Sequence, residues 1–150
     1  MKPIEIIIVD DKKIIRDGLK AIFSRSENFV IKSEASNGKE AIQLISKNNY
    51  DVVIMDINMP EMDGIETTRR IKKRNQKIKI LTNSCHVHSH YIYEMLEAGA
   101  TGFIKKGDDI DCYKEAIWTV NNGGVYLSED ISNETYDKVF NDIRSSRRAS

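Results

Sequence analysis

Side chains able to bind a metal ion or to take part in group transfer follow four apolar segments of this sequence. In chain order they are Asp10 and Asp11, Asp56, Thr82, and Lys105 and Lys106. Clustered carboxylates repel one another, which raises their pKa values or recruits a cation, and oxygen ligands without paired His or Cys suit Mg²⁺. A metal ion, a nucleophilic carboxylate, a lysine and a hydroxyl donor are together what phosphoryl transfer needs.

The elements that must position these groups alternate between short apolar runs and segments of helical spacing. We expect strands at 4–9, 29–35, 51–56, 77–82 and 101–105, and helices at 11–25, 38–48, 65–74, 88–98 and 108–121. Such alternation predicts an α/β fold, with a doubly wound parallel sheet covered by helices on both faces. Ligands bind such sheets beyond the carboxyl ends of the strands, where the winding reverses. The polar groups above fall at those ends.

Each of these residues alone has an ordinary explanation. Asp10 or Asp11 after a strand is often a helix N-cap, and Thr82 alone would be a loop hydroxyl. Lys105 or Lys106 alone would be a solvated charge. Their coherent chemistry at four of the five expected strand ends favours a functional site.

Composition narrows the class of protein. The chain has 150 residues, 40% hydrophobic and 31% charged, with 23 basic and 23 acidic side chains and so no formal net charge. Nothing in this balance directs the chain to nucleic acid or to an anionic membrane. No apolar run is long enough to span a bilayer, and the first residues do not fit a signal peptide. With only two cysteines, we expect a cytoplasmic protein without disulfides.

Four stretches of the chain resemble the receiver domain of two-component response regulators. They are the Ile-Val-Asp-Asp region at 7–11, residues 53–64 (VIMDINMPEMDG), Ile-Leu-Thr at 80–82 and GATGFIKK at 99–106. The likeness covers residues 4 to about 123. It implies a flavodoxin-like, five-stranded parallel sheet of order 2-1-3-4-5. It also implies a signalling phosphoprotein rather than an enzyme, with a sensor histidine kinase as its partner and Mg²⁺ as its cofactor.

The resemblance implies a role for several individual positions. Asp56 is expected to accept the phosphoryl group. The expected Mg²⁺ ligands are Asp10, Asp11, Asp56 and the backbone carbonyl of Asn58. The residues expected to bind the phosphoryl group or to switch on its arrival are Thr82, Lys106 and Phe103. Pro60 and Gly64 are expected to shape the loop after Asp56. Lys106 is preferred to Lys105 because strand residues alternate between faces.

Two positions remain open at this stage. Phe103 could be the family's switch aromatic, which fills the space that Thr82 vacates, or simply a buried core residue. Asn83 stands where many receivers have Ala or Gly, and its larger side chain could narrow access to Asp56. Asn58 and Ser84 lie where the family tunes dephosphorylation, so the lifetime of the phosphoryl group is not predicted.

The segment 123–128 resembles the end of receivers of the LuxR/NarL/FixJ type, which continue into a helix-turn-helix domain. We therefore expect a receiver at 1–123 and a linker or tail at 124–150, with a weak helical stripe formed by Ile131, Thr135, Val139 and Ile143. We expect the output domain to lie outside these 150 residues. DNA binding would belong to that domain and not to this chain, whose phosphorylated form is expected to form a homodimer or bind an effector.

The sequence also offers three alternative functions and three weaker signals. An Asp-nucleophile phosphohydrolase would usually carry Asp-x-Asp after its first strand, and a degenerate scaffold receiver would lack site residues. A nucleotide-binding domain would need a Gly-rich turn there. The tract Cys85–His90 could bind Zn²⁺ or Ni²⁺ but is more simply a polar loop. The basic run 69–79 predicts a solvated face, and Trp118, Met95 and Leu96 are expected in the core or at a dimer face.

Overall fold

The computed structural model describes residues 2–85, 88–128, 131, 137–139, 141–142 and 144–145. The strands are β1 (Ile4–Val9), β2 (Phe29–Ala35), β3 (Val52–Met55), β4 (Lys79–Ser84), β5 (Gly102–Lys105) and β6 (Tyr126–Leu127). The helices are α1 (Lys13–Phe23), α2 (Gly38–Lys47), α3 (Gly64–Arg74), α4 (Ser89–Ala98) and α5 (Ile110–Asn121). The predicted alternation of strands and helices is confirmed.

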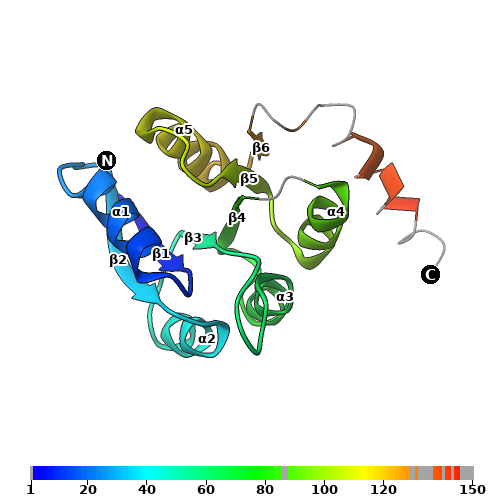
Figure 1. Ribbon diagram of the computed structural model, residues 1–150, viewed down its shortest axis with the longest axis horizontal. Helices are drawn as coiled ribbons and strands as arrows, with labels where there is room; N and C mark the ends of the chain where they lie inside the picture. The colour runs from blue at the N-terminus through cyan, green and yellow to red at the C-terminus, as the bar shows by residue number, and fades with distance from the viewer. Residues whose placement is uncertain are drawn as a thin grey trace.

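The strands form one parallel sheet in the order β2-β1-β3-β4-β5-β6 (Figure 1). The first five follow the predicted flavodoxin-like order. The sixth was not predicted: Tyr126 and Leu127 pair with Gly102 and Phe103 on the outer edge of β5. The boundary expected at residue 123 therefore falls before the last strand of the sheet. A two-residue strand is too short to show an apolar period.

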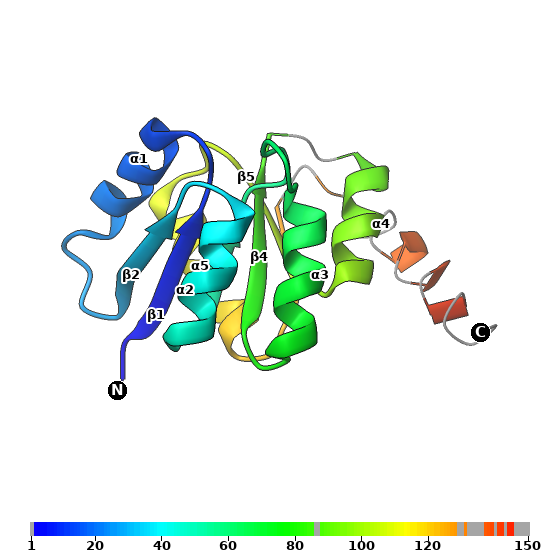
Figure 2. The ribbon, with the colours of Figure 1, turned by 90° about the horizontal axis from the view of Figure 1, so that it is seen from below.

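Helices cover both faces of the sheet, as the alternation predicted. α1 and α5 lie on one face, and α2, α3 and α4 lie on the other (Figures 1 and 2). Successive residues of each strand point to opposite faces, so Ile6 and Ile8 pack under α1 and α5, whereas Ile7 and Val9 pack under α2 and α3. Burial on both faces explains why the central strands are almost entirely apolar.

Side-chain caps define where three of the helices begin. The carboxylate or amide oxygens of Asn37, Asp63 and Asp109 each accept a hydrogen bond from a backbone N–H in the first turn of α2, α3 and α5. Each cap satisfies a donor that the helix leaves free. Asp63 matters most for function because it fixes the start of the helix that follows the Asp56 loop.

Several large apolar side chains of the described residues lie outside the core. They include Ile14 of α1, which is 79% exposed, Trp118 of α5, which is 47% exposed, and Ile110 at the start of α5, which is 36% exposed. Trp118 is therefore not a core residue, and the dimer face expected as its alternative place stays a prediction. Met95 and Leu96 of α4 are buried as expected.

The described residues after β6 include short helical segments that lie on the α4 side of the molecule (Figures 1 and 2). Residues 137–139, 141–142 and 144–145 are helical, and the side chains of Ile131 and Val139 are buried against the α2–α3–α4 face. Thr135 and Ile143 of the predicted stripe lie outside the described residues. Among the helices that the structure describes, none has the length and apolar character needed to cross a membrane.

Candidate functional site

Three acidic side chains come together at the carboxyl ends of β1 and β3. Val9 and Met55 are register partners, and the Asp56 N–H donates to the Val9 carbonyl at 2.9 Å, so Asp10 and Asp56 follow the two strands at the same level. One carboxylate oxygen from each of Asp10, Asp11 and Asp56 lies within 4.8 Å of the others. Residues almost fifty positions apart therefore form one anionic cluster.

Lys106 contacts this cluster. Lys106 Nζ lies 3.0 Å from Asp56 Oδ1 and 3.1 Å from Asp10 Oδ2, and its side chain is only 10% exposed. Its backbone N–H donates to the Ser84 carbonyl at 3.1 Å, which ties the end of β5 to β4. Lys105 is exposed. The alternation of residues along β5 thus brings Lys106, and not Lys105, to the acids.

The cluster is electrostatically strained. Burial raises the pKa of Asp56 from 3.8 to about 6; Lys106 opposes this shift, and the charges of Asp10 and Asp11 add to it. The pKa of Lys106 is also raised: its burial alone would lower the value, but the carboxylates of Asp56 and Asp10 outweigh that effect. One lysine therefore does not neutralise three neighbouring acids.

Two oxygens in the cluster are open for a further partner. Asp10 Oδ2 and Asp11 Oδ1 are buried and accept no hydrogen bond from the residues described, although Lys106 lies near the first of them. Asp10 Oδ1 accepts from the Lys12 N–H at 2.9 Å, which fixes the carboxylate's orientation. Unsatisfied carboxylate oxygens beside excess negative charge fit a small, hard divalent cation such as Mg²⁺.

The loop after Asp56 is shaped by a close backbone approach. A Cβ on Gly64 would lie 2.0 Å from the Asp56 carbonyl oxygen, and the Gly64 N–H donates to the Ile57 carbonyl at 2.7 Å. The Pro60 carbonyl accepts from the Met62 N–H at 2.8 Å. Asn58 is exposed at the top of this loop. The loop therefore folds back tightly onto the residue that carries the candidate nucleophile.

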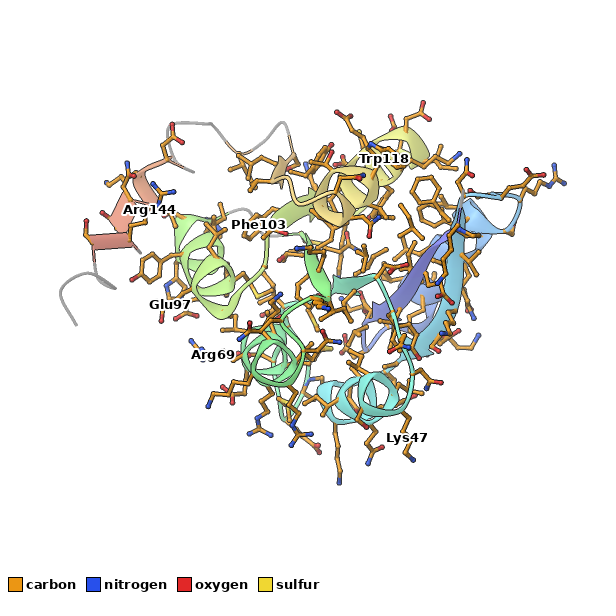
Figure 3. All side chains as sticks on the ribbon, turned by 180° about the vertical axis from the view of Figure 1, so that it is seen from behind. Lys47, Arg69, Glu97, Phe103, Trp118 and Arg144 are labelled. Atoms are coloured by element: carbon orange, nitrogen blue, oxygen red, sulfur yellow. The ribbon has the colours of Figure 1, made fainter. Side chains whose placement is uncertain are left out.

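Thr82 and Phe103 are register partners on β4 and β5, on the α4 side of the site. Thr82 is 1% exposed, and its hydroxyl has no hydrogen-bond partner within the described part of the chain. Phe103 is 5% exposed and lies between the sheet and α4 (Figure 3). Both line one small cavity of about 10 Å³. Burial alone fits both interpretations of Phe103, as a switch aromatic or as a core residue.

Sequence reasoning missed an arginine that supports the acidic turn. Arg16 Nη1 donates to the Asp10 carbonyl at 2.8 Å, and its Nε donates to Glu34 of β2 at 2.8 Å. Arg16 and then Lys20 hold the pKa of Glu34 below its usual value. No local pattern reveals a contact to a carbonyl six residues earlier.

Asn83 is held away from the cluster by a buried hydrogen bond. Its side chain is 1% exposed, and its Oδ1 accepts a hydrogen bond from the Tyr113 hydroxyl of α5 at 2.8 Å. Burial raises the pKa of Tyr113 to about 12, so the hydroxyl stays protonated as a donor. The Asn83 side chain is thus engaged with α5, on the opposite face of the sheet from Phe103.

The structure adds little support for a function of the Cys85–His90 tract or of the basic run 69–79. His86 and Val87 of the Cys85–His90 tract lie outside the described residues, so that candidate stays a prediction. Among the residues that are described, Asp10, Asp11 and Asp56 form the one group with metal-ligand geometry. In the basic run, Arg69 and Arg70 pair with Glu66 on the surface of α3.

Comparison with known proteins agrees with this architecture. The family model of the response regulator receiver domain matches residues 6–117. The transcriptional regulatory protein DegU of Brevibacillus brevis is 36% identical over 86% of this chain. The crystal structure of a LuxR-family two-component response regulator from Aurantimonas sp. SI85-9A1 has a TM-score of 0.84 at 31% identity, covering 91% of this chain and 98% of that one. A chain of the CheX–CheY–BeF3–Mg complex from Borrelia burgdorferi has a TM-score of 0.74 at 30% identity, covering 79% and 90%.

The chain therefore belongs to the response regulator receiver domain family, as its resemblance implied. It is a signalling domain of the two-component type, and its similarity to a LuxR-family regulator agrees with the predicted subfamily. The chain spans 55% of the length of DegU.

Proposed function

We propose that Asp56 accepts a phosphoryl group from the phosphohistidine of a sensor histidine kinase, in a reaction that requires Mg²⁺. The observation that carries this proposal is the cluster of Asp10, Asp11 and Asp56 around Lys106 at the carboxyl end of the sheet. The three acids, two of which have an open carboxylate oxygen, would hold the cation, and Asp56 would also act as the nucleophile.

The proposed reaction forms an Asp56 Oδ–phosphorus bond and breaks the phosphorus–nitrogen bond of the donor's phosphohistidine, so the imidazole leaves with the bonding pair. Asp10, Asp11, Asp56 and the Asn58 carbonyl would hold Mg²⁺, which supplies positive charge to the phosphoryl oxygens. Lys106, already 3.0 Å from Asp56, would pair with a phosphoryl oxygen. Gly64 and Pro60 would keep the loop clear of that group.

Thr82 would then respond to the negative charge of the phosphoryl group on Asp56. Its buried hydroxyl has no hydrogen-bond partner among the described residues, so an added phosphoryl oxygen would give it an acceptor. Movement of Thr82 toward that oxygen would enlarge the cavity that it shares with Phe103, and the aromatic ring would fill the space. The equilibrium between conformations of the receiver would shift toward a state with a changed α4–β5 surface. That surface would form a homodimer or bind an effector.

The domain boundaries follow the same reasoning. We propose that the receiver, expected at 1–123, extends through the short β6 (Tyr126–Leu127). The residues after β6 would lead to an output domain of the helix-turn-helix kind. Its relatives' names support a role in transcription. On this view the chain itself does not bind DNA and works in the cytoplasm.

The test is direct phosphorylation of the full chain. Incubation with Mg²⁺ and acetyl phosphate or phosphoramidate is expected to add one phosphoryl group that base removes and that acid leaves in place. Asp56→Asn should abolish the mass gain. Asp111→Asn, an exposed carboxylate on α5, is the matched control and should retain it. Undiminished labelling of Asp56→Asn would refute the site assignment.

A further inference from the structure

The residues that follow β6 are anchored on the strand that carries Phe103. The Ser128 N–H donates to the Phe103 carbonyl at 2.9 Å, and the Ile131 N–H donates to the Ser128 carbonyl at 3.0 Å. Ser128 is 4% exposed. This turn directs Ile131 back onto the sheet instead of out into solvent.

Ile131 reaches the same cavity as the two switch candidates. Its side chain is 6% exposed and lines the cavity of about 10 Å³ together with Thr82, Phe103 and Ile92. A space of that size holds at most about one water molecule, so the side chains around it leave little free volume. A rearrangement of Thr82 and Phe103 would therefore change the space next to Ile131.

A second contact lies farther along the segment. Val139 is 6% exposed and, with Lys138 and Asp142, lines a groove of about 410 Å³ whose other wall is Ser89, His90 and Tyr93 of α4. The views agree that the described tail residues lie beside α4, with Arg144 at its outer side (Figures 1 and 3). The segment thus contacts β5 and α4 at two separate points.

We propose that Ile131 is a positioning residue for phosphorylation. It wedges Thr82 and Phe103 in the unphosphorylated arrangement, while Val139 holds the C-terminal segment over the α4–β5 face. This inference rests on the proposed function of Asp56 and adds an intramolecular occupant of the face that would change on phosphorylation. Phosphorylation of Asp56 withdraws Thr82 from the cavity, loosens Ile131 and frees that face for a partner.

Thermodynamic linkage connects the packing of the C-terminal segment with the phosphorylation of Asp56, so a change in either one must affect the other. If the phosphoryl group weakens the hold on the segment, then weakening the segment must favour the phosphorylated state by the same factor. If the conformation that can be phosphorylated is only a minor population of the receiver, raising that population increases the observed rate of phosphorylation. Truncation of the Ile131 side chain should therefore raise the rate of Asp56 phosphorylation, although the substitution is not at the phosphorylation site.

The experiment compares Ile131→Ala and Val139→Ser with wild type in the full chain. Val125→Ala is the matched control, because Val125 lies in the same part of the chain but is 44% exposed. Without any phosphodonor, hydrogen exchange of the α4 peptide 89–98 should rise in both test variants and stay at the wild-type level in the control. With Mg²⁺ and acetyl phosphate, both should be phosphorylated about threefold faster or more.

The outcomes separate the two proposals. Wild type phosphorylated on Asp56, with both test variants matching Val125→Ala in rate and in exchange, would overturn the role of Ile131 and leave the proposed function intact. Absence of phosphorylation in every chain would refute the function and, with it, this inference. If Ile131→Ala does not fold, Val139→Ser alone decides, since Val139 packs on α4 away from the sheet.

Discussion

At the scale of single residues, the site combines charges that folding does not balance. Asp56 is 4% exposed and has two acids and one lysine around it, so ionising it is unfavourable until a cation arrives. A divalent cation, as we propose for this site, would offset that cost. Lys106 alone would suffice for one buried carboxylate, not for three.

The first prediction concerns pH. In the absence of divalent cations, Asp56→Asn should raise the free energy of unfolding at pH 7.5 by about 1 kcal/mol or more, because it removes a buried charge. Folding raises the pKa of Asp56 to about 6, so its ionised form costs stability above that pH.

That cost shrinks between pH 6 and the unfolded value near 3.8, and it is absent below that value, where the carboxyl is protonated in both states. Urea titrations of wild type and Asp56→Asn at pH 7.5 and pH 4 measure the difference. A gap between the two proteins that widens toward acid pH would contradict the prediction.

Residue-level roles were only partly predictable from sequence. Strand alternation distinguished Lys106 from Lys105, because a period of two is a local property. The contact of Arg16 with the Asp10 carbonyl and the bond between Asn83 and Tyr113 join distant segments, so only the packed structure shows them.

At the scale of elements, the local signals in the sequence agreed with the fold. Largely buried runs marked β1, β3, β4 and β5, whereas β2 is partly polar and partly exposed. Asn37, Asp63 and Asp109 begin three of the helices as caps. The exposure of Ile14 and Trp118 was not predictable, since a helical period shows which residues share a face but not how far a neighbouring element covers it.

The second prediction compares two glycines. Gly64→Ala should destabilise the protein by several kcal/mol or prevent folding, because its Cβ would collide with the Asp56 carbonyl at 2.0 Å. Gly18→Ala, in α1, meets no atom within 4 Å and should stabilise by about 0.5–1 kcal/mol. Thermal unfolding of both variants measures the contrast. Equal effects of the two changes would show that the Asp56 loop is not held as tightly as described.

At the scale of the whole molecule, the site joins the two halves of the sheet. Asp10 and Asp11 follow β1, Asp56 follows β3, and Lys106 follows β5, so a ligand here would bridge three strands. Ligands that bind only the folded chain stabilise all of it.

The third prediction follows from that bridging. Mg²⁺ at a hundred times its dissociation constant should stabilise the chain against urea by about 2.7 kcal/mol, and Asp11→Asn should remove most of that gain. The control is KCl at matched ionic strength, which should not reproduce the effect. Equal stabilisation of wild type and Asp11→Asn would place the ion elsewhere.

The two edges of the sheet are protected by different means, with a consequence for self-association. On β2, Lys32 pairs with Glu5 and donates to the Asn49 carbonyl, which puts charge along an otherwise open ladder. On the opposite side, β6 covers β5 and offers only two residues of its own. Neither edge strand is a good template for pairing with a strand of another copy, so extension of the sheet from one molecule to the next is disfavoured. Two copies that meet in solution are therefore expected to associate through a face that includes a helix, such as the α4–β5 face, and not by pairing of edge strands.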